Sequence, residues 1–296
     1  MEDVWPPTEY LGSMCGGQAE NGGYNSAMED HRWIDVSPRH SIRLASELLQ
    51  LIDRPQQWDF TVHTIEKRIV NGAPLMSAEI VIAGSNTREQ FPLAAKYPLH
   101  FRKTYFAARL HADPAVEYEN TLEASLLLDM PEPIGHSSAT FRSCLIPGAP
   151  YKRLTPFHSE ADDGNLRQAA DLPLAAAAGL WRLAEEAFAR LSKLHEGGLA
   201  HGDAELQNYV VCPAPLEVLM IDFEVVVRRD RVDADAWQKR CALDRVPLLR
   251  EAIFLQAAMG RQRGPLADLS WQAAPGLFRD ADRFRRAMDR LGDLST

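Results

Sequence analysis

The chain has 296 residues, of which 46% are hydrophobic and 25% charged, and its formal net charge is -9. This length can bury a core in one large domain or in two lobes. The acidic balance argues against nucleic acid as the main partner, because phosphate contacts require clustered Lys and Arg. No apolar run approaches the ~20 residues of a membrane span. Four scattered cysteines without a C-x-x-C pair indicate reduced thiols. We therefore expect a cytoplasmic protein, although a secreted effector without a cleaved signal would share these features.

Residues 1–57 are predicted to form an N-terminal extension with one helix. The first 35 residues contain Gly and Pro pairs and little periodicity, which is typical of an irregular leader. Ser37 is a plausible N-cap with Pro38 at the first helical position, and Pro55 lies just past the expected end of this helix.

Residues 58–146 favour short strands. β-type runs alternate with turn residues from Phe60 to Tyr97, and the last of them, Phe91–Tyr97, is predicted to be a strand. Asp113 and Pro114 are expected to start a helix that runs to about residue 128. Residues 141–146 are predicted to form another strand.

Residues 147–296 are predicted to be mainly helical. A long amphipathic helix is expected from Pro173 to the Gly197-Gly198 pair. A hairpin should follow at residues 209–223, and further helices at 243–259 and 277–291. Strands followed by helices predict an α+β chain of two lobes, with a cleft where ligands usually bind.

A polar run follows the long predicted helix. It begins His201-Gly202-Asp203, and Asn208 lies five residues after Asp203. Asp222 comes fourteen residues later, at the end of an apolar run. This set of groups is what a Mg-ATP phosphotransferase needs: one carboxylate to deprotonate an acceptor hydroxyl, and an amide oxygen with a second carboxylate to hold the metal.

These residues resemble the catalytic loop and metal-binding Asp of the protein-kinase superfamily. The resemblance implies a two-lobed protein-kinase-like fold, with a small β-rich N-lobe at 58–146 and a mainly helical C-lobe at 147–296, and ATP with Mg²⁺ as cofactors. By this resemblance Asp203 is the catalytic base, Asn208 and Asp222 are Mg²⁺ ligands, and His201 is structural. Gly202 is similar to the glycine of aminoglycoside and other small-molecule kinases and of atypical protein kinases of the Rio type, where typical eukaryotic protein kinases carry Arg.

A second set of resembling residues lies in the first lobe. Phe91–Tyr97 resembles the strand with the Val-Ala-Ile-Lys motif, so Lys96 would reach the α- and β-phosphates. Its partner is expected to be Glu123 on the next helix, with Glu119 as the rival. Lys103 is the alternative to Lys96.

The remaining nucleotide contacts are expected by position alone. The phosphate-covering loop should lie between Ile69 and Ile82, and the lobe hinge near residues 144–148. The residues expected there are Gly72 and Ser77 in the loop, Ile80 and Ala95 at the adenine, and Ile146 at the hinge.

Two departures and one further similarity mark the loop region. Asp222-Phe223-Glu224 has Glu in place of the usual Gly, which removes easy access to positive φ. Glu205 stands where protein kinases often place a Lys. Asp244 resembles the helix Asp that supports the catalytic loop in kinases.

The first functional hypothesis is an active ATP-dependent kinase that acts on a protein Ser/Thr or on a small molecule. The alternative is a pseudokinase that serves as a nucleotide-binding or protein-binding module. A third hypothesis is transfer of a nucleotide on the same fold.

Overall fold

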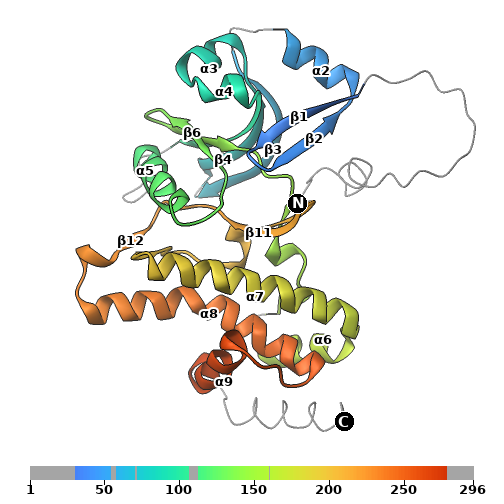
Figure 1. Cartoon of the computed structure of the whole chain (residues 1–296), viewed down its shortest axis with the longest axis vertical. Helices are drawn as coiled ribbons and strands as arrows, with labels where there is room; N and C mark the ends of the chain where they lie inside the picture. Colours follow the sequence, from blue (N-terminus) through green and yellow to red (C-terminus); the bar gives the residue numbers. More distant parts are fainter. Residues whose placement is uncertain (1–30, 55–57, 71, 107–112, 160, 279–296) are drawn as a thin grey trace, which may run out of the picture. The chain divides into compact units, whose positions relative to one another are not determined.

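The computed structural model describes residues 31–54, 58–70, 72–106, 113–159 and 161–278 (Figure 1). The predicted leader up to residue 30 and most of the predicted helix 277–291 lie outside the described residues. The chain divides into two compact units, Met1–Pro147 with Pro213–Pro215, and Gly148–Cys212 with Leu216–Thr296. None of the described helices is long and apolar enough to cross a membrane.

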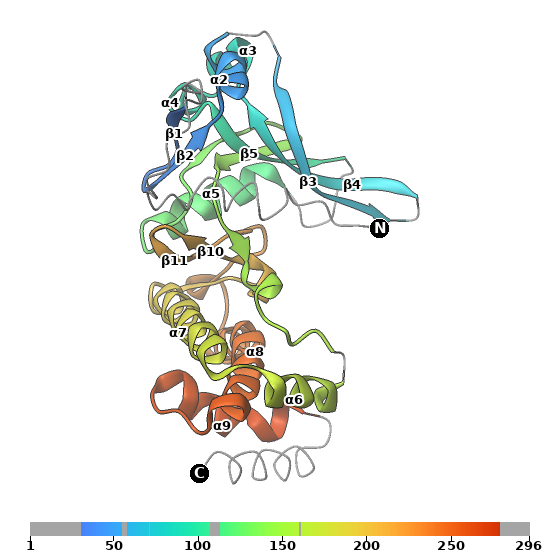
Figure 2. The same cartoon turned by 90° about the vertical axis from the view of Figure 1, so that its right-hand side faces the viewer.

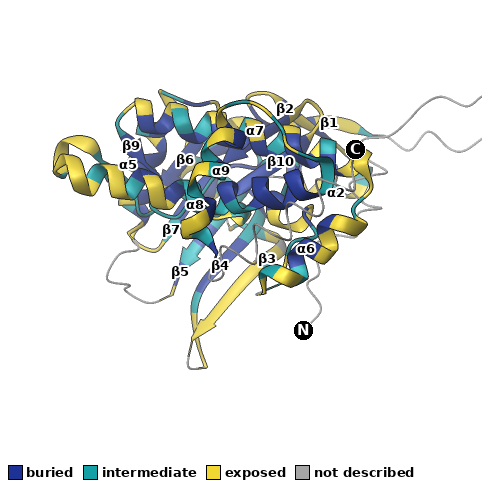
Figure 3. Ribbon diagram, turned by 90° about the horizontal axis from the view of Figure 1, so that it is seen from below, coloured by how far each residue is buried: buried dark blue, intermediate teal, exposed yellow. Residues whose placement is uncertain are grey.

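The first unit is built on a five-stranded antiparallel sheet of order β3-β4-β5-β7-β6. Its strands are β3 (Phe60–Val70), β4 (Ala73–Ile82), β5 (Leu99–Tyr105), β6 (Pro133–His136) and β7 (Thr140–Cys144). β4 and β5 pair without interruption from Met76↔Tyr105 to Ile82↔Leu99. β3 is an edge strand whose register against β4 shifts three times, and it is exposed along most of its length (Figure 3). Such bulges twist an edge strand and discourage pairing with other chains.

The N-terminal helix begins later than predicted. β1 (Arg32–Ser37) and β2 (His40–Leu44) form an antiparallel hairpin, and α2 (Ser46–Asp53) follows it. Pro38 therefore lies in a turn and does not start a helix. The physical reason is the period-two alternation of buried residues in both strands, which outweighs the capping pattern. Hairpin and helix pack on Ile82 and Leu99 of the sheet and on Leu145, which follows β7.

The predicted strand Phe91–Tyr97 is wrong, because this segment is helical. α3 (Ser85–Gln90) is followed by the single turn α4 (Leu93–Lys96). Phe91, Ala94 and Tyr97 are three residues apart and are buried in one cluster. A spacing of three is typical of a helix. The strand was predicted because the apolar residues of this segment are nearly contiguous. The strand that follows, and that pairs between β4 and β7, is β5.

α5 (Pro114–Ser125) confirms the predicted helix, and Asp113 caps it by accepting a hydrogen bond from the backbone N–H of Ala115. Its buried face is unusual because it is largely polar. The buried residues are Pro114, Glu117, Asn120, Thr121 and Ala124. Leu122 is exposed on this helix, and Leu126 just after it is 84% exposed.

The second unit is mainly helical. Its helices are α6 (Asp162–Asp171), α7 (Leu174–Glu196), α8 (Ala234–Met259) and α9 (Pro265–Leu277), with short 3-10 turns η1 (Tyr151–Arg153), η2 (Leu206–Asn208) and η3 (Arg229–Arg231). Its strands are β8 (Ala149–Pro150), β9 (Leu199–Ala200), β10 (Tyr209–Pro213), β11 (Leu216–Met220) and β12 (Val227–Arg228). α7 and α8 pack against each other, and α6 and α9 lie at the C-terminal end of α8 (Figure 2).

The long helix and the hairpin of this unit were predicted correctly. α8 begins at Ala234, nine residues before the expected start, and Asp233 caps it through the backbone N–H of Ala236. α6 and α9 were not predicted. A sheet-rich first unit and a helical second unit confirm the predicted α+β fold class.

Candidate functional site

Asp244 of α8 organises the loop that follows α7. Its carboxylate is buried and accepts hydrogen bonds from the backbone N–H groups of His201 (2.7 Å, to Oδ2) and Gly202 (3.0 Å, to Oδ1). His195, in the last turn of α7, places Nε2 3.0 Å from Oδ2. A buried carboxylate requires several donors to offset its desolvation. Asp244 therefore ties the end of α7 and the loop to α8, which agrees with the interpretation drawn from its resemblance.

Gly202 is required by the backbone of this loop. Its φ is +85°, in the left-handed region, and a Cβ atom there would lie 2.1 Å from the carbonyl oxygen of Val225. Any side chain would meet backbone that has little room to shift. The His-Gly-Asp sequence is thus a consequence of close packing between the loop and the segment after Asp222.

The His201 ring is neutral and links the loop to the end of β11 through two hydrogen bonds. Its Nε2 lies 2.9 Å from the carbonyl oxygen of Ile221, and Nδ1 accepts the backbone N–H of Asp203 (3.3 Å). This pairing requires the proton on Nε2. Complete burial lowers the pKa of His201, and the ring packs 4.7 Å from the ring of Phe223. The structural role predicted for His201 agrees with these contacts.

Asp203 and Asn208 are brought together by η2. The Asn208 amide nitrogen Nδ2 donates to the carbonyl oxygen of Asp203 (2.7 Å) and lies 3.3 Å from its carboxylate Oδ2. Because Nδ2 is used in this way, the amide oxygen Oδ1 is the group that Asn208 can offer to a cation. The Asp203 side chain is only partly buried, so it remains accessible for chemistry.

Asp222 follows β11 in an uncommon conformation. Its φ is +70°, the only positive value among the described residues other than glycine. Backbone on both sides is fixed, since the Ile221 N–H donates to the Asn208 carbonyl oxygen (3.0 Å) and Phe223 is fully buried. Strained backbone of this kind is maintained where a side chain must be aimed. A carboxylate and an amide oxygen are ligands that suit Mg²⁺.

The first unit contains a separate buried ion pair. Lys103 of β5 places Nζ 3.4 Å from Oε1 of Glu117 on α5, and both side chains are at most 6% exposed. The hydroxyl of Tyr105 donates to Oε2 of Glu117 (2.5 Å). Burial, and then the charge of Glu117, raise the pKa of Tyr105 above its ordinary range, so this phenol stays protonated.

The predicted pair Lys96–Glu123 is wrong. Lys96 lies on α4, is 62% exposed, and pairs with Glu132 at 3.6 Å. Lys103, the alternative, is the buried lysine, and it pairs with Glu117 in place of the expected Glu123 or its rival Glu119.

Sequence reasoning missed Glu117 because the buried face of α5 lacks an apolar stripe. The one available indication was its position in the first turn after the Asp113 cap, on the same face as Thr121 and Ala124.

The five residues expected to contact the nucleotide differ in burial and in the element that carries them. Gly72 is at the β3–β4 turn, where φ is +79° and a Cβ atom would have no other atom within 4 Å. Ser77 is buried on β4, and Ile80 of the same strand packs partly against the core beneath α2. Ala95 is exposed on α4, which removes the reason for placing it beside Lys96 on a strand. Ile146 is half-buried just after β7.

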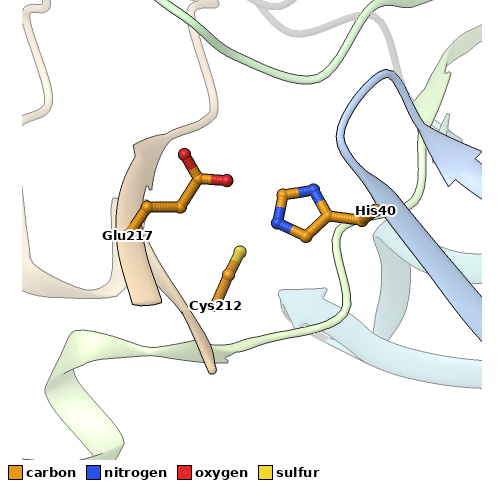
Figure 4. Close-up of side chains that lie close together, drawn as sticks. All are labelled: His40, Cys212 and Glu217. Atoms are coloured by element: carbon orange, nitrogen blue, oxygen red, sulfur yellow. The ribbon is translucent and has the colours of Figure 1, made fainter. Parts of the chain in front are cut away.

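Cys212 and Glu217 lie on the neighbouring strands β10 and β11 (Figure 4). Burial raises the pKa of the Cys212 thiol to about 12, so it is protonated at neutral pH. Glu217 is paired with Arg190 of α7 at 3.6 Å. His40, also drawn in Figure 4, shares a 2.6 Å hydrogen bond with the hydroxyl of Ser37 in the β1–β2 hairpin.

Comparison with known proteins gives structural matches only. No protein-family model and no curated protein matches the chain. The kinase domain of PknI from Mycobacterium tuberculosis, as a double mutant, is similar with a TM-score of 0.43 and 15% identity, over 79% of this chain and 95% of that one. A single mutant of the same domain gives 0.43 and 14% over the same shares. The kinase domain of BubR1 gives 0.42 and 10%, over 82% and 89%. All three are described as kinase domains.

Proposed function

We propose that this chain is an ATP- and Mg²⁺-dependent phosphotransferase that moves the γ-phosphate to a hydroxyl group of a protein Ser or Thr or of a small molecule. The observation that carries the proposal is the Asp203–Asn208 pair on a loop held by Asp244. A partly exposed carboxylate beside an amide oxygen places a proton acceptor next to a group that can bind Mg²⁺.

Each residue would have a distinct task. Asp203 would orient the acceptor hydroxyl and take its proton, while Asn208 Oδ1 and the Asp222 carboxylate would hold Mg²⁺. When bound, the metal supplies neutralisation of the charge on the β- and γ-phosphates. Lys103, oriented by Glu117, would donate to phosphate oxygens. The protein contributes mainly positioning and fixed charge.

The first test is a melting scan with ATP and Mg²⁺. We expect a metal-dependent rise in Tm for the wild type and its loss in Asp222→Ala. Asp235→Ala, which removes an exposed carboxylate from the first turn of α8, is the matched control and should keep the full shift. An equal shift in the wild type and in Asp222→Ala would contradict the metal assignment.

The catalytic role of Asp203 is tested by measuring the rate of phosphate transfer. Asp203→Ala should lower the rate by roughly 10² or more while leaving the nucleotide-dependent shift in place. An unchanged rate would remove Asp203 from the mechanism.

One alternative has a specific observation in its favour. The β3–β4 turn has a single glycine, Gly72, where a phosphate-covering loop usually has several, and Glu205 is exposed in the catalytic loop. A pseudokinase that binds nucleotide without transfer would tolerate both. It predicts the Tm shift together with no phosphate transfer to any acceptor in a panel of proteins and small hydroxyl compounds. Mass spectrometry of modified targets separates phosphate transfer from nucleotide transfer.

A further inference from the structure

Three arginines of the second unit lie on elements that contact the catalytic loop or the turn before it. Arg229 is in η3, directly after β12, and Arg240 and Arg245 are in the first half of α8. The chain as a whole carries a net charge of -9, so a local group of cations beside the loop is not a consequence of composition.

Arg240 touches the loop itself. Its Nη1 lies 3.4 Å from the carbonyl oxygen of Gly202, the residue immediately before Asp203. A guanidinium has five N–H donors, and one long contact leaves most of them for another acceptor. Arg240 is partly exposed, so a ligand can reach it.

Arg229, in η3, and Arg245, in α8, are both close to Cys241 of α8. β12 pairs with β9 through Arg228↔Leu199, and the Arg229 N–H then donates to the Gly198 carbonyl oxygen at 2.9 Å. This fixes the backbone of Arg229 beside the start of the loop. Burial raises the pKa of the Cys241 thiol, and Arg245 and Arg229 oppose that rise. Both cations are therefore close to Cys241, the neighbour of Arg240.

Among the described residues, none of these three guanidinium groups forms an ion pair. In the described part of the chain, no carboxylate oxygen lies within 4.0 Å of the side-chain nitrogens of Arg229, Arg240 or Arg245. Arg245 Nε is buried and has no hydrogen-bond partner there. Three acidic residues close in sequence have other partners, since Asp244 accepts three hydrogen bonds, Asp233 caps α8 and Asp230 lies 4.0 Å from Arg231. Other arginines of the unit, such as Arg190 and Arg250, have carboxylate partners.

We propose that Arg229, Arg240 and Arg245 bind an anionic group of the acceptor, a phosphate or a carboxylate, beside Asp203. The guanidinium fork matches two oxygens of such a group, and charge-assisted hydrogen bonds of this kind are strong. The inference rests on the proposed function, since it assigns the acceptor of that same reaction to negatively charged hydroxyl compounds or to acidic protein segments that present a Ser or Thr.

The first test measures anion binding without nucleotide or metal. Inorganic phosphate is titrated in the presence of EDTA and followed by calorimetry. The wild type should bind it in a salt-dependent manner, and Arg229→Gln/Arg240→Gln should weaken binding by about ten-fold or more. Arg229→Lys/Arg240→Lys, which keeps the charge, should restore much of the affinity. Melting curves of all variants check that the fold is retained.

Two controls make the result decisive. Arg231→Gln removes one positive charge, half of that lost in the double variant, from an exposed neighbour that already faces Asp230, and should leave binding within about two-fold. Lys103→Met tests occupation of a phosphate site in the first unit. Absence of phosphate binding, equal weakening by Arg231→Gln, or loss in Lys103→Met alone would overturn the proposal.

The second test uses acceptors. Ser peptides flanked by Asp and Glu are compared with the same peptides flanked by Lys and Arg. We expect the acidic set to be used with the higher kcat/KM, and the double Gln variant to lose that preference while its KM for ATP is unchanged. A preference for basic peptides would overturn the inference. Phosphate binding without any Mg-ATP shift would instead overturn the proposed function and leave the anion site standing.

Discussion

Two buried carboxylates, one in each unit, are compensated in different ways. Asp244 in the second unit receives two backbone N–H groups and the ring of His195. Glu117 in the first unit receives two side chains, Lys103 and Tyr105. Backbone donors cannot move without the loop that carries them, whereas a lysine can change rotamer. Asp244 therefore holds the shape of a loop, and Glu117 holds the position of one cation.

Removing Asp244 should have the largest effect on stability. Asp244→Ala leaves two loop N–H groups and His195 without their acceptor, and breaking a buried charged network by removing one partner costs about 3–5 kcal/mol. Urea unfolding should report this loss. Asp233→Ala, which removes only the exposed cap of the same helix, should cost about 1 kcal/mol. Equal losses in the two variants would show that the buried network adds nothing beyond an ordinary helix cap.

A third buried carboxyl, Glu251 of α8, avoids an uncompensated charge by binding a proton. The Tyr151 hydroxyl has one proton and two possible acceptors, the Leu180 carbonyl oxygen at 3.1 Å and Glu251 Oε1 at 3.3 Å. Tyr151 is the donor in both contacts, and the hydrogen bonds of Glu251 with Thr155 and Tyr151 lower the pKa of this carboxyl, against the larger effect of burial. Burial raises the pKa of Glu251 from 4.5 to about 7, which agrees with a protonated acid.

The pH dependence follows from this raised pKa. Below pH 4.5 both the folded and the unfolded chain hold the proton. Between pH 4.5 and about 7 the unfolded chain releases it first, so stability falls as pH rises, by up to about 3 kcal/mol. Glu251→Gln should remove this fall and be more stable than the wild type at pH 8. Parallel curves for both proteins across that window would contradict the protonated state.

The two units also differ in how far the spacing of residues along the sequence predicts their site. The loop residues of the second unit could be predicted from it, and the ion pair of the first unit could not. His201, Asp203, Asn208 and Asp222 lie within 22 residues, joined by a hairpin, so their local spacing in the sequence already constrains their arrangement in space. The Asp203–Asn208 contact spans only five residues.

The first-unit pair depends on packing that spacing does not encode. α5 buries Glu117 and Asn120 and exposes Leu122, which reverses the usual amphipathic pattern. The run Phe91–Tyr97 resembles a strand because its apolar residues are contiguous, and only burial identifies Phe91, Ala94 and Tyr97 as one helical face. The predicted ion pair between Lys96 and Glu123 was wrong for the same reason.

The Lys103–Glu117 pair should show a smaller effect than Asp244. Lys103→Met leaves Glu117 with the Tyr105 hydroxyl still in place, and an incompletely satisfied buried group costs about 1–3 kcal/mol. A double-mutant cycle with Glu117→Gln should give a coupling of at least about 0.5 kcal/mol. Additive losses would show that the two side chains do not stabilise each other. In the melting scan with ATP and Mg²⁺, Lys103→Met should reduce the shift.

Substitution of Lys96 should have the smallest effect. Lys96 is a useful comparison with Lys103, because both are lysines of the first unit and only Lys103 is buried. Lys96→Met removes an exposed pair with Glu132 at 3.6 Å, and exposed pairs contribute about 0–1 kcal/mol. Unfolding should change by less than about 0.5 kcal/mol, and the nucleotide-dependent Tm shift should match the wild type. A lost shift in Lys96→Met with an intact one in Lys103→Met would return the phosphate-binding role to Lys96. That outcome would separate the buried ion pair of β5 and α5 from nucleotide binding and leave it a purely structural contact.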